Sequence, residues 1–539
     1  MLFPYKDLTV LLVDDATPIL VTIKAMLIKF GFSEKNVFTA KSAKLAIAHA
    51  SSYAFDVVIS DFNLGPGLNG KQLYEELTHY RYLKSTTVFI LISGDNSAAT
   101  IRPVVELKPD EYILKPFTAN ELNKRLVSAI ERKRVLAPLY EAERTLNPES
   151  GLKICDELEP FYKAYFFEIA QFRGSFLTML SMHNEAKATF EAAIVKKPTN
   201  WAKLGLANSL ANLGEHQEAD MIIASVLSSM PNNTFARTEA AKVNLVNSKV
   251  PHAIAHLEIA SKLTPGNSER ELVIANLCLA MGDYAQALGR YRTYIELNKN
   301  TYRANIYSDI NLVRFMLFAY CAHSPGSDLM QAIRSHLRHI IDTGSEQIKS
   351  EIDLTLAHYA VSQRNYSAAV TLLTKISTAV PPNHFYTAYQ YAWLADYLEL
   401  EEGFATAIEH CKNTIKIESS QLLFTSKITL LNELCKANQN KTRWIDSQFH
   451  KLSNTDDAAD QLRTYLEIHS KHPRLKEVCF HIIKLLNVTW PTQLGGLQVK
   501  DIIQRCHAIV SQLYSESDKQ SMNYESIYRT ALSKCNERI

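Results

Sequence analysis

The chain lacks an excess of charge of either sign. Its 539 residues include 58 Lys and Arg against 56 Asp and Glu, so the protein has no overall field that would draw it to nucleic acid or to an anionic membrane. No apolar run reaches eighteen residues, and the start, MLFPYKDLTV, has no basic segment followed by a long apolar one. These absences argue against a membrane-spanning helix and a secretory signal, and we expect a cytoplasmic protein.

Signature motifs of several enzyme classes are also missing. The sequence contains no H-E-x-x-H, no G-x-S-x-G and no G-x-x-x-x-G-K-[ST], which argues against a zinc protease, an α/β-hydrolase and a P-loop nucleotidase. It contains no GGDEF or EAL string, the marks of cyclic-dinucleotide enzymes, and no recognisable helix-turn-helix module. We therefore expect neither an enzyme that acts on an outside substrate nor a DNA-binding protein.

Paired cysteines are absent as well. None of the eight cysteines forms a C-x-x-C pair that would suggest zinc or redox chemistry; they are Cys155, Cys278, Cys321, Cys411, Cys435, Cys479, Cys506 and Cys535. Because most lie in apolar helical segments, we expect buried, reduced thiols. His450 and His469 lie near charged residues and could suggest a phosphotransfer site. A surface histidine without such a role is commoner, and that is our expectation for both.

What the chain does have is a set of polar residues at the ends of predicted strands. The segments 8–13, 56–60, 88–92 and 111–114 are rich in Val, Ile and Leu without polar alternation, as strands covered on both faces must be. The polar residues that follow them are Asp14, Asp15, Asp61, Ser93 and Lys115. In open α/β folds, this edge of the sheet is where ligands bind.

Strands and helices alternate through the first 134 residues. A shorter strand is predicted at 36–40, and helices are predicted at 17–30, 42–51, 69–80, 97–106 and 119–134. Strict alternation implies right-handed crossovers and a parallel sheet with helices on both faces. The sequence predicts an α/β, doubly wound, flavodoxin-like domain with five parallel strands.

In this order the polar residues resemble the receiver domain of bacterial response regulators. That family has an acidic pair after the first strand, an Asp after the third, Ser or Thr after the fourth and Lys-Pro after the fifth. The matching residues here are Asp14 with Asp15, Asp61, Ser93, and Lys115 with Pro116. Each residue alone is more often a turn or cap residue, but the ordered set favours a receiver over residues 1–134.

The resemblance implies a site and a chemistry. Mg²⁺ or Mn²⁺ would be bound by Asp14, Asp15, Asp61 and the backbone carbonyl of Asn63, because a hard cation relieves the repulsion of clustered carboxylates. Asp61 would be the nucleophile that accepts a phosphoryl group from a phosphohistidine. Lys115 would offset charge on the phosphoryl oxygens. Such a domain promotes only its own phosphorylation and dephosphorylation.

The resemblance also implies a switch. Ser93 would follow the phosphoryl group with its hydroxyl, and Tyr112 matches the aromatic residue that turns inward with it. Gly94 would leave the site open to the donor. The loop after Asp61, FNLGPGLNG, carries more glycine than is frequent in the family, and we expect it to alter dephosphorylation or partner access without removing a ligand.

A repeat comes next, over residues 155–420. Ala186, Ala219, Ala253 and Ala287 recur at steps of 33, 34 and 34 residues, and Gly214, Ser248 and Gly282 precede the last three by five positions. Prolines recur in step at Pro198, Pro231 and Pro265. The period resembles that of tetratricopeptide (TPR) repeats, in which two helices joined by a tight turn stack into a solenoid. Looser units include Ala357, Tyr366, Ala369 and Pro381, then Ala395, Phe404, Ala407 and Cys411.

The flanks of this all-α, TPR-like solenoid are less regular. We expect a linker helix over residues 135–154, with Pro138 and Pro148 marking the boundary. Residues 421–539 are expected to be helical, either as degenerate repeats or as a capping bundle.

The two halves together resemble response regulators with a TPR-type effector region, a group that includes the VieB-like proteins. That resemblance implies that a histidine kinase or phosphotransfer protein phosphorylates Asp61, and that the helical groove binds another protein, with a component of the same phosphorelay as one candidate. Two alternatives stay open, namely a phosphate sink with an assembly array, and an RNA-binding helical repeat protein. A homodimer through the later receiver helices is also left open.

Overall fold

Two compact units make up the chain. A computed structural model describes residues 5–95, 106–107, 109–323, 327–377, 384–416, 418 and 420–539. The first unit comprises Met1–Ile274 and Arg292–Asn305, and the second comprises Ala275–Tyr291 and Ile306–Ile539. No helix within these described ranges is both long and apolar enough to cross a membrane.

The first unit opens with a sheet of five parallel strands. They are β1 (Val10–Val13), β2 (Val37–Ala40), β3 (Val57–Asp61), β4 (Val88–Ser93) and β5 (Glu111–Leu114). Their spatial order is β2-β1-β3-β4-β5, and every neighbouring pair is parallel. Because β1 lies beside β3, the residues that come after them meet at one edge. The predicted flavodoxin-like fold is confirmed.

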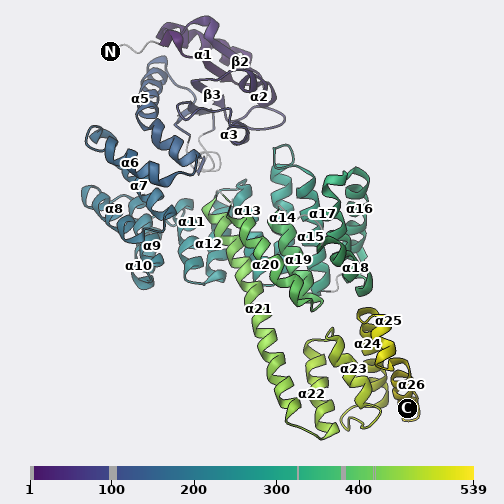
Figure 1. The fold of residues 1–539 in the computed structure, drawn as a ribbon. Helices are drawn as coiled ribbons and strands as arrows, with labels where there is room; N and C mark the ends of the chain where they lie inside the picture. The colour runs from purple at the N-terminus through teal and green to yellow at the C-terminus, as the bar shows by residue number, and fades with distance from the viewer. Residues whose placement is uncertain are drawn as a thin grey trace. The chain divides into compact units, whose positions relative to one another are not determined.

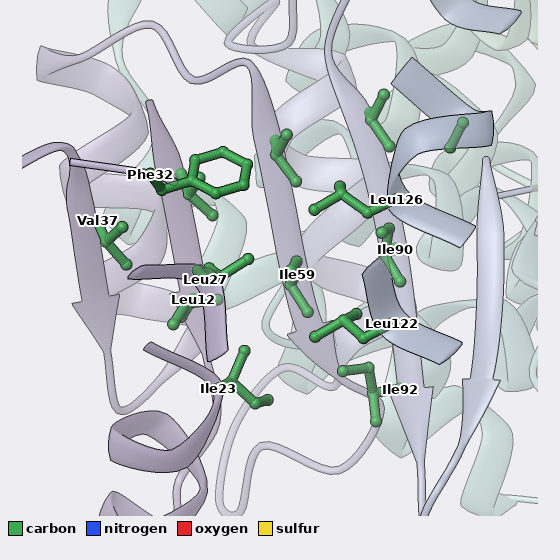
Figure 2. Packing of buried hydrophobic residues seen from close by; sticks show 14 of the residues in the cluster. Leu12, Ile23, Leu27, Phe32, Val37, Ile59, Ile90, Ile92, Leu122 and Leu126 are labelled. Carbon is green, nitrogen blue, oxygen red and sulfur yellow. The ribbon is translucent and has the colours of Figure 1, made fainter. Parts of the chain in front are cut away.

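Helices cover both faces of this sheet. They are α1 (Thr17–Phe30), α2 (Ala43–Ser52), α3 (Gly70–His79) and α5 (Ala119–Arg144). On one face Leu12 and Ile59 pack with Leu27 of α1 and Leu126 of α5 (Figure 2). On the other face Leu11, Val58 and Phe89 pack with residues of α2 and α3. Double coverage explains why the strands lack polar alternation. Of the helix predicted over 97–106, all but Glu106 lies outside the described residues.

The prediction of a linker helix over 135–154 was wrong in its limits. Helix α5 continues through Pro138 to Arg144, and α6 (Pro148–Leu158) begins after a short break. A proline inside a helix costs about 3 kcal/mol, because a hydrogen bond is lost and the ring crowds the preceding turn. Leu136, Leu139 and Ala142 are buried in a cluster with residues of α6 and α7, and this burial offsets that cost.

The rest of the first unit consists of paired helices (Figure 1). They are α7 (Phe166–Met179), α8 (His183–Lys196), α9 (Asn200–Asn212), α10 (His216–Ser229), α11 (Thr234–Val246) and α12 (Val250–Leu263). The predicted turn residues Gly214 and Ser248 have φ values of 86° and 56°, where glycine is favoured because it lacks a Cβ. Ala186, Ala219 and Ala253 are fully buried. The period is therefore a period of helical hairpins.

Two helices are shared between the units, and the second unit continues the hairpins. The shared helices are α13 (Ser268–Ala280) and α14 (Tyr284–Asn298). Next come α15 (Ile306–His323), α16 (Ser327–Thr343), α17 (Lys349–Ser362), α18 (Tyr366–Ser377), α19 (Phe385–Tyr397) and α20 (Glu401–Ile415). Ala357, Ala369 and Ala395 are fully buried and Ala407 nearly so. Pro381 lies outside the described residues.

The C-terminal region is helical, as predicted. It comprises α21 (Gln421–Ser453), α22 (Ala458–Lys471), α23 (Lys476–Leu485), α24 (Gly496–Leu513), α25 (Glu516–Ser521) and α26 (Tyr524–Asn536). Residues of α22, α23, α24 and α26 share one hydrophobic core. We call this group the C-terminal bundle.

Candidate functional site

Three of the predicted site residues meet at the carboxyl end of the sheet. The Lys115 Nζ atom donates to Asp14 Oδ2 at 2.9 Å and to Asp61 Oδ1 at 2.6 Å. Both carboxylates are buried, with exposed fractions of 3% for Asp14 and 9% for Asp61. One ammonium therefore holds two carboxylates from neighbouring strands.

Backbone amides fix the other oxygen of each carboxylate. The Ala16 N–H donates to Asp14 Oδ1 at 2.8 Å, and the Asn63 N–H donates to Asp61 Oδ2 at 2.9 Å. These contacts need the tight turns after β1 and β3. The two acids are thereby oriented by the fold rather than by solvent.

Asp15 is placed differently from its neighbour. It is exposed, and among the described residues it takes no part in the ion pairs of Lys115. A Cβ at Gly65, where φ is 72°, would lie 3.2 Å from Asp15 Oδ2. The glycine-rich loop after Asp61 therefore closes over Asp15, and a larger residue at position 65 would crowd its carboxylate.

Burial and charge shift the acidity of this cluster in a consistent way. Burial raises the pKa of Asp61, the nearby Asp14 carboxylate adds to the rise, and Lys115 opposes it. Burial alone would lower the pKa of Lys115, but its hydrogen bonds and charge pairing with Asp14 and Asp61 raise it overall. Lys115 thus stays an ammonium, and the two carboxylates retain a mutual repulsion that a further cation would relieve.

The predicted switch residues meet at one backbone segment. The Asp95 N–H donates to Ser93 Oγ at 3.1 Å, and Ser93 Oγ in turn donates to the Asp95 carbonyl at 3.3 Å. The Tyr112 hydroxyl donates to the same carbonyl at 3.4 Å. Nothing lies within 4 Å of a Cβ built at Gly94. Ser93 and Tyr112 are therefore both tied to the chain that leaves β4.

Known proteins resemble the N-terminal part of the chain. Residues 10–127 match the response regulator receiver domain family. The chemotaxis protein CheY-3 of Vibrio cholerae is 29% identical over 127 residues, which are 24% of this chain and 95% of that protein. This part of the chain is a CheY-like receiver domain.

Two further relatives are similar to the same part of the chain. The alkaline phosphatase synthesis transcriptional regulatory protein PhoP of Bacillus subtilis is 27% identical over 161 residues, covering 30% of this chain and 64% of that protein. A solved structure of the chemotaxis response regulator CheY4 of Vibrio cholerae is 26% identical, covers 23% of this chain and 98% of that chain, and has a TM-score of 0.20.

The receiver also contacts the helical region inside the first unit. Receiver residues on α3 and next to the end of β4 face residues 266–303; we call the receiver side the docking face, comprising Lys71, Gln72, Glu75, Glu76, His79 and Glu106. Lys71 Nζ donates to the Gly266 carbonyl at 2.8 Å, and the Tyr302 N–H donates to Glu76 at 2.6 Å. The sequence carried no signal for this contact, because its two sides lie far apart along the chain.

Charge complementarity holds the docking face in place. Arg303 Nη1 lies 2.9 Å from Glu75 Oε2, and Arg270, which is 3% exposed, pairs with Glu106. Arg270 also donates to the Ala260 and Thr264 carbonyls at 2.9 and 3.1 Å, so its guanidinium is fixed before it meets Glu106. A receiver carboxylate on the chain after Ser93 is thus tied to the helical region.

Two expectations about histidines and cysteines need correction. His450 is exposed, as expected, but His469 is buried with an exposed fraction of 7%, so it is not a surface histidine. All eight cysteines are free thiols, and six of them are buried. The structure nevertheless brings Cys479 and Cys506 next to His469, which their spacing of 27 residues did not indicate.

Proposed function

We propose that the protein is a two-component response regulator that is phosphorylated on Asp61 by a histidine kinase or phosphotransfer protein. In this proposal it acts through protein binding by its TPR-like, VieB-like helical region rather than through DNA. The observation that carries the proposal is the Lys115 ammonium, held 2.6 Å from Asp61 and 2.9 Å from Asp14 at the edge of a receiver sheet. This geometry presents one carboxylate next to a fixed positive charge.

The chemistry is consistent with that arrangement. An Asp61 oxygen forms a bond to phosphorus while the bond between phosphorus and the donor imidazole nitrogen breaks, and the imidazole keeps the electron pair. Lys115 faces the charge that builds up on the phosphoryl oxygens. Asp14, Asp15, Asp61 and the Asn63 carbonyl would hold Mg²⁺, which suits oxygen ligands and would offset the same charge.

Removing one of these ligands should impair metal binding without unfolding the receiver. Asp15 is exposed, so Asp15→Asn disturbs no core packing. We expect Mg²⁺ affinity to fall at least about tenfold, because one charged ligand of a hard cation is lost. Titration of Mg²⁺ by isothermal calorimetry measures this. Asp7→Asn, an exposed change elsewhere on the receiver, serves as the control, and equal affinity in both variants would remove Asp15 from the ligand set.

The contacts of Ser93 suggest how phosphorylation reaches the helical region. When the Ser93 hydroxyl turns toward a phosphoryl group on Asp61, it leaves the backbone of Asp95, which Tyr112 also holds. The chain from Asp95 leads to Glu106, which pairs with Arg270. A local change of charge therefore acts on a contact of the docking face.

The second unit contains a cavity suited to a partner. Its volume is about 940 Å³, and its lining combines apolar residues with charged ones, including Asp396, Glu399, Lys441 and Arg474. Concave helical arrays bind peptides and helices of other proteins with such mixed surfaces. This cavity supports protein binding as the output.

Phosphorylation should loosen the docking face. We expect beryllofluoride with Mg²⁺, which mimics the phosphoryl group, to speed amide exchange in α3 and in residues 266–303 of the full chain. The reason is that the observed contacts belong to the unphosphorylated state. Hydrogen exchange measured by mass spectrometry detects the change, and Asp61→Asn should show none.

Paired charge removals test the same contact without phosphorylation. Glu75→Gln combined with Glu106→Gln removes two ion pairs of the docking face and should reproduce the faster exchange. Glu34→Gln removes an exposed pair with Lys24 and should not. If beryllofluoride leaves residues 266–303 unchanged, the receiver does not signal through this face, and the phosphate-sink alternative is favoured.

A further inference from the structure

A buried group of two thiols and one imidazole lies in the C-terminal bundle. His469 belongs to α22, Cys479 to α23 and Cys506 to α24. The exposed fractions are 7% for His469 and 0% for each cysteine. One ligand atom of each residue lies within 4.8 Å of the other two. Three successive helices thus direct metal-binding side chains to one point.

The spacing of these atoms fits a metal ion. In a tetrahedral zinc site with Zn–S of about 2.3 Å and Zn–N of about 2.0 to 2.1 Å, neighbouring sulfur and nitrogen ligands lie about 3.6 Å apart. The distance from Cys479 Sγ to His469 Nδ1 is 3.6 Å, and that from Cys506 Sγ to His469 Nε2 is 3.9 Å. A small rotation of the imidazole would let one nitrogen face both sulfur atoms.

The surroundings make an uncharged explanation costly. The group sits in a core that includes Leu462, Val478, Ile482 and Ile503, each with an exposed fraction of at most 1%. The imidazole nitrogens contact thiol sulfur atoms, and thiols form only weak hydrogen bonds. Burying a polar ring with weak partners costs free energy, and coordination of a cation would recover it.

We propose that His469, Cys479 and Cys506 bind one thiophilic metal ion, assigned as Zn²⁺, which ties α22, α23 and α24 together. Thiolate and imidazole ligands suit Zn²⁺ and Cu⁺ and do not suit Mg²⁺ or Ca²⁺. Zn²⁺ takes three protein ligands together with one small fourth ligand. Binding would add to the stability of the bundle, because an unfolded chain does not present the three ligands together.

Metal content of the full-length protein tests this site. After removal of metal with a chelator and incubation with Zn²⁺, we expect one tightly held Zn²⁺ per chain by native mass spectrometry, and almost none in Cys479→Ser or Cys506→Ser. Cys535→Ser is the matched control, since Cys535 is buried in the same core but donates to the Gly496 carbonyl instead. Zn²⁺ should raise the melting temperature of the control and not of the two variants.

A spectroscopic reading does not depend on how the variants fold. Co²⁺ added to the metal-free wild-type protein should give thiolate charge-transfer absorption in the near ultraviolet, which Zn²⁺ abolishes. Absence of Zn²⁺ and Co²⁺ binding by the reduced protein would overturn the proposal. A bond between Cys479 and Cys506 in non-reducing peptide analysis of freshly isolated protein would also overturn it. Retention of Cu⁺ but not Zn²⁺ would overturn the assignment of zinc.

Discussion

Asp61→Asn is expected to abolish phosphoryl uptake. With Mg²⁺ and a small donor such as phosphoramidate, the wild-type chain should gain one phosphoryl group, and the variant should gain none above the detection limit. An amide oxygen is a far weaker nucleophile than a carboxylate, and the substitution leaves the shape of the side chain unchanged. Intact-protein mass spectrometry and phosphate-affinity electrophoresis measure the product.

The Asp61 variant should lose chemistry without losing its fold. Burial and the neighbouring Asp14 raise the pKa of Asp61, so the native receiver holds this carboxylate in an environment that disfavours its charge. Removing that charge should leave the melting temperature equal or higher. Asp7→Asn, on the exposed surface, should be phosphorylated normally. Uptake by Asp61→Asn at the wild-type level would place the phosphoacceptor elsewhere.

Glu351→Gln is expected to cause the largest loss of stability. Glu351 of α17 pairs with Arg314 of α15 and accepts from the Thr387 hydroxyl of α19 at 2.6 and 2.7 Å. The exposed fractions of Arg314 and Glu351 are 1% and 7%. Removing one partner leaves a buried charge uncompensated, which costs about 3 to 5 kcal/mol. The melting transition of the second unit should fall by roughly 10 °C.

The pH dependence separates this mechanism from general damage. Burial by itself raises the pKa of Glu351, but the charge of Arg314 and hydrogen bonds from Thr387 and Arg314 lower it overall. Its contribution is therefore present above the pKa of the unfolded chain, about 4.3, and is lost as pH falls through the lower pKa of the folded state. The difference between wild type and Glu351→Gln should narrow below about pH 4.

Acid weakens both proteins for a separate reason, so the difference between them is the quantity to measure. Burial lowers the pKa of His358 to about 3, and between that value and about 6.5 only the unfolded chain binds the proton. Glu346→Gln, which removes the exposed partner of Lys349, is the control and should not change the melting temperature. An equal loss in both variants would contradict the role of the buried pair.

Several features could be predicted because they depend on local sequence. Continuous apolar strands without alternation indicated a sheet covered on both faces, and Asp14, Asp61 and Lys115 were placed at its edge because parallel strands end together. The hairpin period was visible because Gly214 and Ser248 occupy turns with positive φ. In each case the chemistry of a few neighbouring residues limits the backbone.

Other features escaped prediction because they depend on distant partners. Pro138 suggested a boundary, yet α5 passes through it, since Leu136 and Leu139 are buried against later helices. Cys479 and Cys506 carried no recognisable spacing, and His469 was expected at the surface. Their grouping exists only because α22, α23 and α24 pack around one core.

Short-range patterns were enough to specify the receiver fold, the identity of its edge residues and the period of the helical hairpins, because hydrophobic periodicity and turn chemistry act over short distances. The folded chain was needed to establish which receiver residues meet residues 266–303, how Arg314 and Glu351 are paired, and where thiols and an imidazole converge. Those contacts join residues far apart in the chain, and their energies arise from burial and complementary charge that no local pattern encodes.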